Sequence, residues 1–165
     1  EIPVMNKLKE FYDKIERIRS PGTIEGGDVL KIENQFFVGL SGRTNQEGIE
    51  HFEYVVERYG YSVTSVKMDK MLHLKTGVAY LGDDVLLAAG EMIGKSEFEA
   101  YEMIQVPEDE GYAANCVCLN GNVVFPEGYP KTESLVEERG FNTLTVDVSE
   151  FKKLDGGISC LSLRF

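Results

Sequence analysis

Near its N-terminal end the chain reads Val29-Leu30-Lys31-Ile32-Glu33-Asn34-Gln35-Phe36-Phe37-Val38-Gly39-Leu40, which is two short apolar runs joined by a polar turn. Runs of this length, rich in β-branched and aromatic residues, predict a pair of antiparallel strands. Residues 45–59 then repeat apolar side chains at helical spacing, and residues 62–67 alternate like a further strand. The predicted unit is therefore strand, turn, strand, helix, strand.

Two more copies of this unit follow. The second has strands at 77–81 and 85–89, a short helix near 96–100 and a strand near 102–106. The third has strands at 115–119 and 122–125, a helix at 130–139 that begins with proline, and a strand at 142–148. The strands of the third copy meet at Asn120-Gly121, the strongest short signal for a hairpin. Repeated units of strands and helices predict an α/β fold.

The ends of the chain resemble parts of the same unit. Residues 4–15 predict an amphipathic helix and residues 16–19 a short strand, as in the second half of an earlier copy. Ile158-Ser159-Cys160-Leu161-Ser162-Leu163 alternates apolar and small residues, which predicts a strand that opens a later copy. Because such repeats need neighbours to bury their faces, we expect residues 1–165 to form a single domain, an arc cut from a larger ring.

The composition excludes several classes of protein. A net charge of −11 disfavours nucleic acid as a partner, because phosphates would be repelled, and suits a small cationic ligand. No apolar run approaches the roughly 20 residues of a membrane span, and the N-terminus has no secretory signal pattern. Three cysteines form no disulfide framework, so the expected compartment is the reducing cytoplasm.

Cys160 is the first candidate for chemistry, because the preceding Gly156-Gly157 turn would let its thiol project into a cleft. A lone thiol is more often a small core side chain, and it gains catalytic meaning only with a distant histidine. His73, just before a predicted strand, could act with Cys160 as a general acid and base, although alone it is more often structural. His51 lies on the polar side of the first long helix and is expected to be solvated.

Glu25 and Arg43 lie on either side of the first hairpin. Glycines beside Glu25 would let a ligand or side chain approach the backbone closely, while an ordinary acidic surface turn is the alternative. Arg43 lies on a loop of small residues, where it could grip a carboxylate with two hydrogen bonds or remain a solvated charge. Either Thr44 or Asn45 is a plausible cap for the helix that follows.

Cys116 and Cys118 are two residues apart on a predicted strand, so they face the same side. No further cysteine or histidine lies nearby to complete a tetrahedral metal site, so core packing is expected rather than metal binding. The chain also has no glycine loop of the P-loop or Rossmann type. We therefore expect neither a metal nor a cofactor.

Six short motifs together carry a resemblance to a known family. They are Glu25-Gly26-Gly27-Asp28, Ser41-Gly42-Arg43-Thr44-Asn45, Leu72-His73-Leu74-Lys75-Thr76-Gly77, Ala88-Ala89-Gly90-Glu91, Ala113-Ala114-Asn115-Cys116 and Asp155-Gly156-Gly157-Ile158-Ser159-Cys160. In this order they resemble the bacterial dimethylarginine dimethylaminohydrolases, of the guanidine-modifying or pentein superfamily. That resemblance implies a ring of five strand-and-helix modules around a central active site, of which this chain holds about three modules plus two half modules.

The resemblance also implies roles for three residues. Cys160 resembles the nucleophile that attacks the guanidinium carbon of a methylated arginine. His73 resembles the acid and base that protonates the departing amine and then activates water. Glu25 resembles the carboxylate that orients the guanidinium and steadies His73. The implied activity is hydrolysis of dimethylarginine to citrulline and dimethylamine through a covalent intermediate on the cysteine.

Further residues match the family's substrate-binding positions. Arg43 resembles a clamp on the substrate carboxylate, while the backbone carbonyl of Leu154, with Asp155 beside it, matches the part that meets the substrate amino group. Arginine deiminases of the same superfamily have an aspartate where this chain has Lys75, which favours a methylated substrate.

The first modules of the family, with their acidic substrate segment and second arginine clamp, have no match in this sequence. We therefore expect them, or a complementary chain, as partners, and self-association is a further possibility. Two alternatives remain open: a deiminase-like hydrolase, and an incomplete, non-catalytic fragment that acts only as an assembly piece.

Overall fold

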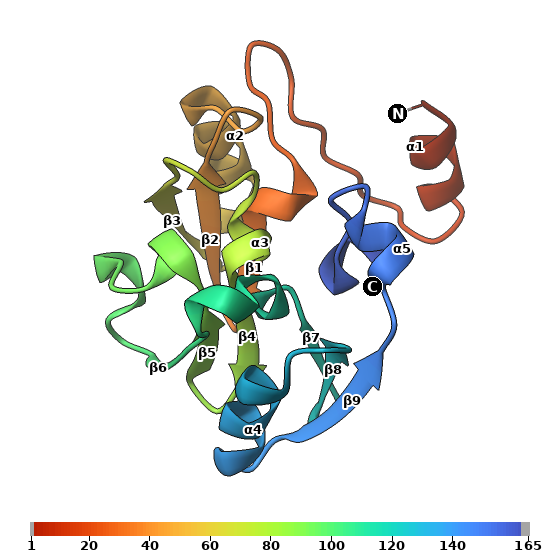
Figure 1. Cartoon of the computed structure of the whole chain (residues 1–165). Coiled ribbons are helices and arrows are strands. Elements are labelled where there is room, and N and C mark those ends of the chain that lie inside the picture. The colour runs from red at the N-terminus through yellow and green to blue at the C-terminus, as the bar shows by residue number, and fades with distance from the viewer. Residues whose placement is uncertain (1, 163–165) are drawn as a thin grey trace.

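A computed structural model describes residues 2–162, in which three separate three-stranded sheets follow one another in an arc (Figure 1). Each sheet has the same connections: its first two strands form an antiparallel hairpin, and its third strand runs parallel to the second. The predicted threefold repeat is therefore confirmed, and so is the α/β class.

The first module is built as the sequence predicts. Its elements are β1 (Val29–Ile32), β2 (Gln35–Leu40), α2 (Gln46–Glu57) and β3 (Ser62–Lys67). Glu33 occupies the turn with a φ of 48°. Asn45 caps the helix, because its side-chain oxygen accepts a hydrogen bond from the Gly48 N–H.

The second and third modules repeat this order with different helices. Module two contains β4 (Val78–Gly82), β5 (Val85–Ala88), η2 (Gly90–Met92), η3 (Ser96–Phe98) and β6 (Glu102–Gln105). Module three contains β7 (Val117–Leu119), β8 (Asn122–Pro126), α4 (Pro130–Glu138) and β9 (Asn142–Val146). The helix predicted near 96–100 is only a single 3₁₀ turn. The Asn120-Gly121 turn has φ values of 51° and 76°, as a tight hairpin requires.

A short helical turn lies before the first strand of each module, at η1 (Gly26–Asp28), α3 (Leu74–Gly77) and η4 (Glu108–Ala114). The C-terminal segment contributes two more, α5 (Ser149–Lys152) and η5 (Ile158–Leu161). The three modules are thus entered through helical turns at equivalent positions.

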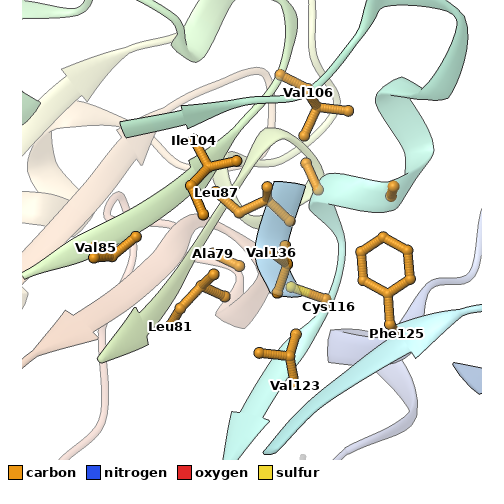
Figure 2. Packing of buried hydrophobic residues seen from close by; sticks show 13 residues of the cluster. Ala79, Leu81, Val85, Leu87, Ile104, Val106, Cys116, Val123, Phe125 and Val136 are labelled. Atoms are coloured by element: carbon orange, nitrogen blue, oxygen red, sulfur yellow. The ribbon is translucent and has the colours of Figure 1, made fainter. Parts of the chain in front are cut away.

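The core lies between the sheets, in two layers. One cluster joins the first and second sheets, and another joins the second and third (Figure 2). Val78, Leu86 and Ala88 contribute to the first cluster, while Ala79 and Leu87 contribute to the second. The second sheet is therefore buried on both faces, which explains why its hairpin strands β4 and β5 are almost continuously apolar instead of alternating.

The predictions for the two ends of the chain are partly wrong. The N-terminal helix α1 covers only Ile2–Leu8, and residues 16–19 form no strand. Residues Ile158–Leu161 form the 3₁₀ turn η5 instead of a strand, and Leu163 lies outside the described residues. A strand is stable only when it pairs, and no described strand pairs with either segment.

Two other sequence predictions can be compared with the structure. His51 is half-buried, and its Nδ1 accepts a hydrogen bond from the Arg19 N–H, so it holds the incoming chain instead of being fully solvated. Within residues 2–162, no helix has the length and apolar character needed to cross a membrane.

Candidate active site

Glu25 and His73 are in direct contact, with 2.6 Å between Oε2 of the carboxylate and Nε2 of the ring. Glu25 precedes η1 and His73 precedes α3, so the pair comes from the entry turns of two neighbouring modules. The His73 side chain is 19% exposed and that of Glu25 is 42% exposed. The pair is therefore partly open to solvent.

Arg43 lies on the other oxygen of the same carboxylate, with its Nη1 3.3 Å from Oε1 of Glu25. Both oxygens of Glu25 thus have a partner. Hydrogen bonding to His73 lowers the pKa of the Glu25 carboxyl, and Arg43 adds to this, so that together they outweigh the opposing effect of burial. The carboxylate is consequently ionised at neutral pH.

Asp28 links the segments that carry these three residues. Its buried carboxylate accepts hydrogen bonds from the Ser41 hydroxyl at 2.8 Å, the Thr44 hydroxyl at 2.6 Å and the Leu74 N–H at 3.0 Å. The first two donors flank Arg43, and the third follows His73. One buried acid therefore sets the spacing between the arginine loop and the histidine turn.

A second carboxylate holds the loop that leads into His73. Glu91, just after β5, accepts hydrogen bonds from the backbone N–H groups of Asp69, Lys70 and Met71 at 2.6–2.9 Å. Partial burial raises the pKa of the Glu91 carboxyl, but the three N–H groups outweigh this and lower it overall.

Cys160 lies on η5 and is exposed, whereas Cys116 is buried and Cys118 is partly buried against the same apolar cluster. Burial raises the pKa of the Cys116 thiol to about 12, so this thiol stays protonated. The prediction that Cys116 and Cys118 pack in the core is confirmed.

Leu154 and Asp155 lie on the same C-terminal segment as Cys160, just beyond α5. The Leu154 residue is 87% exposed, and Asp155 turns the chain with a φ of 57°. The Gly156 carbonyl that follows accepts a hydrogen bond from the Tyr112 hydroxyl at 2.6 Å. This contact ties the segment to η4, and η4 in turn packs on α3, whose first residue follows His73.

The predicted site residues therefore form two groups. Glu25, His73 and Arg43 are joined by direct contacts, while Cys160, Leu154 and Asp155 share one segment that η4 connects to the histidine turn. A cavity of about 300 Å³ opens between β1, β4 and β7, and Lys75 and Ser159 are among its lining residues. Residues 2–162 contain no cluster of three potential metal-ligating acids, histidines or cysteines.

Sequence reasoning missed the supporting residues Asp28, Glu91, Tyr112 and Asn115. Three of these stand in the six motifs quoted above, but their spacing gives no indication of which backbone groups they would meet. Their partners lie 13 to 46 positions away in the chain.

Comparison with known proteins identifies relatives that match most of this chain. The sequence model of the family described as arginine deiminase matches residues 3–113. An N(G),N(G)-dimethylarginine dimethylaminohydrolase of Pseudomonas aeruginosa is 46% identical over 159 residues, which cover 96% of this chain and 63% of that protein. One of Streptomyces coelicolor is 38% identical over 146 residues, covering 87% of this chain and 55% of the relative.

A solved structure is similar along nearly the whole described arc. A cysteine-to-serine mutant of the P. aeruginosa enzyme complexed with citrulline superimposes with a TM-score of 0.96 at 44% identity, covering 99% of this chain and 65% of the other. The chain thus spans somewhat under two thirds of the length of these relatives.

Proposed function

Because the chain belongs to the arginine deiminase family, we propose that it carries the nucleophile and the acid and base of an enzyme that hydrolyses dimethylarginine to citrulline and dimethylamine. The observation that carries this proposal is the 2.6 Å contact between Glu25 and His73. A histidine oriented by a carboxylate on a fixed turn is the arrangement that general acid–base catalysis needs. The dimethylarginine dimethylaminohydrolases among the relatives support the choice of substrate.

The proposed reaction proceeds in two halves. The Cys160 thiolate attacks the guanidinium carbon, and the bond from that carbon to the dimethylamino nitrogen breaks as His73 donates a proton to the leaving dimethylamine. His73 then takes a proton from water, the resulting hydroxide attacks the same carbon, and the C–S bond breaks to release citrulline and the thiolate. Water supplies the oxygen of citrulline, and no oxidant or reductant is consumed.

Glu25 and Arg43 suggest how the cationic substrate is received. The guanidinium group of Arg43 lies 3.3 Å from Oε1 of Glu25. The same carboxylate oxygen is therefore suited to bind the guanidinium group of a substrate. We propose that Arg43 then turns to the substrate α-carboxylate. The net charge of −11 favours the approach of such a cation.

The C-terminal segment would hold the other end of the substrate. The Leu154 carbonyl lies on an exposed turn and accepts no hydrogen bond from residues 2–162, so it is suited to receive a substrate ammonium group, with the charge of Asp155 beside it. A nucleophilic thiol must also stay reduced, which favours the cytoplasm as the compartment.

Two solved structures of relatives support the pairing of His73 with Cys160. One is the cysteine-to-serine mutant complexed with citrulline, and the other is a histidine-to-glycine adduct of a dimethylarginine dimethylaminohydrolase with S-methyl-L-thiocitrulline. The substituted histidine and the substituted cysteine are separated by a certain number of positions in the relatives. His73 and Cys160 are separated by the same number of positions in this chain.

A deiminase acting on arginine itself is the second candidate, because the matching family model is described as arginine deiminase. Lys75 argues against it, since it replaces the aspartate by which deiminases bind the unmethylated guanidinium. An inactive assembly fragment is a less favoured alternative, because the chain retains the Glu25–His73 contact.

The decisive experiment measures citrulline formation from dimethylarginine and, separately, from arginine. The chain spans 63% of its P. aeruginosa relative, so the assay uses it alone and with the remaining modules added as a second polypeptide. We expect weak or no activity alone and turnover of dimethylarginine in the assembly. Cys160→Ser should abolish turnover, and His73→Ala should slow it about 10²–10⁴-fold. Normal turnover by His73→Ala would show that the proposed acid and base is wrong.

A further inference from the structure

Tyr112 of η4 and Asn115, the residue directly after η4, fasten the turn that carries Cys160. The Tyr112 hydroxyl donates to the Gly156 carbonyl at 2.6 Å, and Oδ1 of Asn115 accepts from the Ser159 N–H at 2.9 Å. The second bond acts on the residue immediately before the cysteine. The turn's own hydrogen bond, from the Cys160 N–H to the Gly157 carbonyl, is 3.0 Å long.

Gly157 reveals how closely Asn115 packs against this turn. Its φ of −138° and ψ of 174° are extended values that any residue adopts, so the backbone conformation does not require glycine. A Cβ at this position, however, would overlap the carboxamide of Asn115. The glycine therefore leaves the space that the carboxamide occupies.

The side chain of Asn115 is buried and carries no charge. The residue is 5% exposed, so its carboxamide is held in one place by the surrounding atoms. An aspartate of the same shape would also accept the Ser159 hydrogen bond but would add a negative charge near the thiol, which disfavours a thiolate. An amide fixes the turn without that effect.

The same η4 segment also packs against α3, directly after His73. Burial raises the pKa of the Tyr112 hydroxyl, and the charges of Tyr129 and Cys160 add to this effect, which is consistent with the thiol lying near this ring. The segment is thus in contact with the supports of both reacting groups.

We propose that Asn115 is a positioning residue for Cys160, which fixes the turn that carries the thiol without touching the substrate itself. The hydrogen bond to Ser159 and the contact with Gly157 together transmit the position of η4 to the nucleophile. This inference rests on the proposed function only for the role of Cys160.

The test compares three variants with the wild-type chain. Asn115→Ala removes the hydrogen bond, Asn115→Asp keeps the acceptor and adds a charge, and Asn122→Ala serves as the control. The Asn122 carboxamide likewise bonds to a backbone group, but as a donor to the Asn120 carbonyl and on an exposed hairpin.

Two measurements on the 165-residue chain do not depend on turnover. Hydrogen exchange at residues 156–161 should become about fivefold faster in Asn115→Ala, as expected for the loss of one ordinary hydrogen bond, and should stay at the wild-type rate in Asn115→Asp and in the control. The rate of Cys160 alkylation as a function of pH should shift to higher pH in Asn115→Asp. A residue with a merely structural role would leave that profile unchanged.

The third measurement uses the catalytic assembly. We expect kcat of Asn115→Ala to fall by about 10²-fold with little change in KM, because misplacement of a reacting group by about 1 Å has this effect. A wild-type kcat for Asn115→Ala would overturn the proposal. If the wild-type assembly forms no citrulline, the proposed function fails instead, and an unshifted alkylation profile for Asn115→Asp then overturns the positioning role by itself.

Discussion

The imidazole ring of His73 rests on the backbone of Gly27, since a methyl group at that glycine would lie 2.7 Å from Cγ of the ring. Gly27 belongs to η1, directly beyond Glu25, so the same turn provides both the carboxylate that contacts the ring and the surface that supports it. The neighbouring Gly26 has open space where its Cβ would be.

These two glycines give a matched pair of substitutions. Gly27→Ala should displace the ring, lengthen the contact between Glu25 and His73, and lower kcat by about 10²-fold. Gly26→Ala should leave kcat within about twofold of wild type, because nothing lies near its new methyl group. Steady-state kinetics of the two variants checks this, and equal rates for both would show that the ring does not depend on Gly27.

Asp28 should be important for stability as well as for site geometry. In Asp28→Asn, one of the two acceptor oxygens becomes an NH₂ group, which faces either the Leu74 N–H, at the place of Oδ1, or the Ser41 and Thr44 hydroxyls, at the place of Oδ2. A buried donor without an acceptor costs about 1–3 kcal/mol, so the free energy of unfolding in urea should fall by that amount. Asp83→Asn, on an exposed hairpin turn, is the control and should change it by less than about 0.5 kcal/mol.

The lowered pKa of the Glu91 carboxyl leads us to expect that the stability of the fold depends on pH. Its folded pKa lies below the ordinary value of 4.5, so the ionised carboxylate stabilises the fold above that pH, and this contribution is lost as the pH falls through the folded pKa. The melting temperature of wild type should therefore exceed that of Glu91→Gln at neutral pH, with the difference shrinking below pH 4.5. A difference that stays constant down to acid pH would contradict the role of the carboxylate. Glu138→Gln, at the exposed end of α4, provides the comparison.

The three thiols should react with alkylating agents in a fixed order. Brief treatment at neutral pH, followed by peptide mass mapping, should label Cys160 first, because it is exposed, and Cys116 last, because it is buried and its pKa is raised to about 12. Preferential labelling of Cys116 would contradict the assignment of Cys160 as the accessible thiol.

The sequence predicted the modules because each hairpin is encoded locally. Alternation in residues 62–67 and the Asn120-Gly121 turn depend only on neighbours in the chain. The same alternation in Ile158–Leu161 was misleading, because a strand also needs a partner and the described arc offers none there. The double burial of the second sheet, likewise, becomes visible only when two other sheets are packed against it.

The contact between Glu25 and His73 was expected from the sequence, whereas the residues that support the candidate site were not. Glu25, His73 and Cys160 stand out by residue type, and the expectation that Glu25 steadies His73 agrees with their contact. The contacts of Asp28 with Leu74 and of Asn115 with Ser159 are made to backbone N–H groups, which nearly every residue carries, so no residue type marks these partners in the sequence.

The separation of the three sheets has a consequence for how substitutions in the core can move the modules relative to one another. No backbone ladder joins one described sheet to the next, so the angle between the second and third modules is set by the packing of an apolar cluster to which Leu87 and Val123 both contribute (Figure 2). A change of one methylene group there would tilt the third module against the second, carrying Asn115 and the segment it holds while His73 stays behind. The position of the Cys160 segment relative to the Glu25–His73 pair can therefore be changed from the interior, by substitutions that alter neither these residues nor the pairing of any described strand.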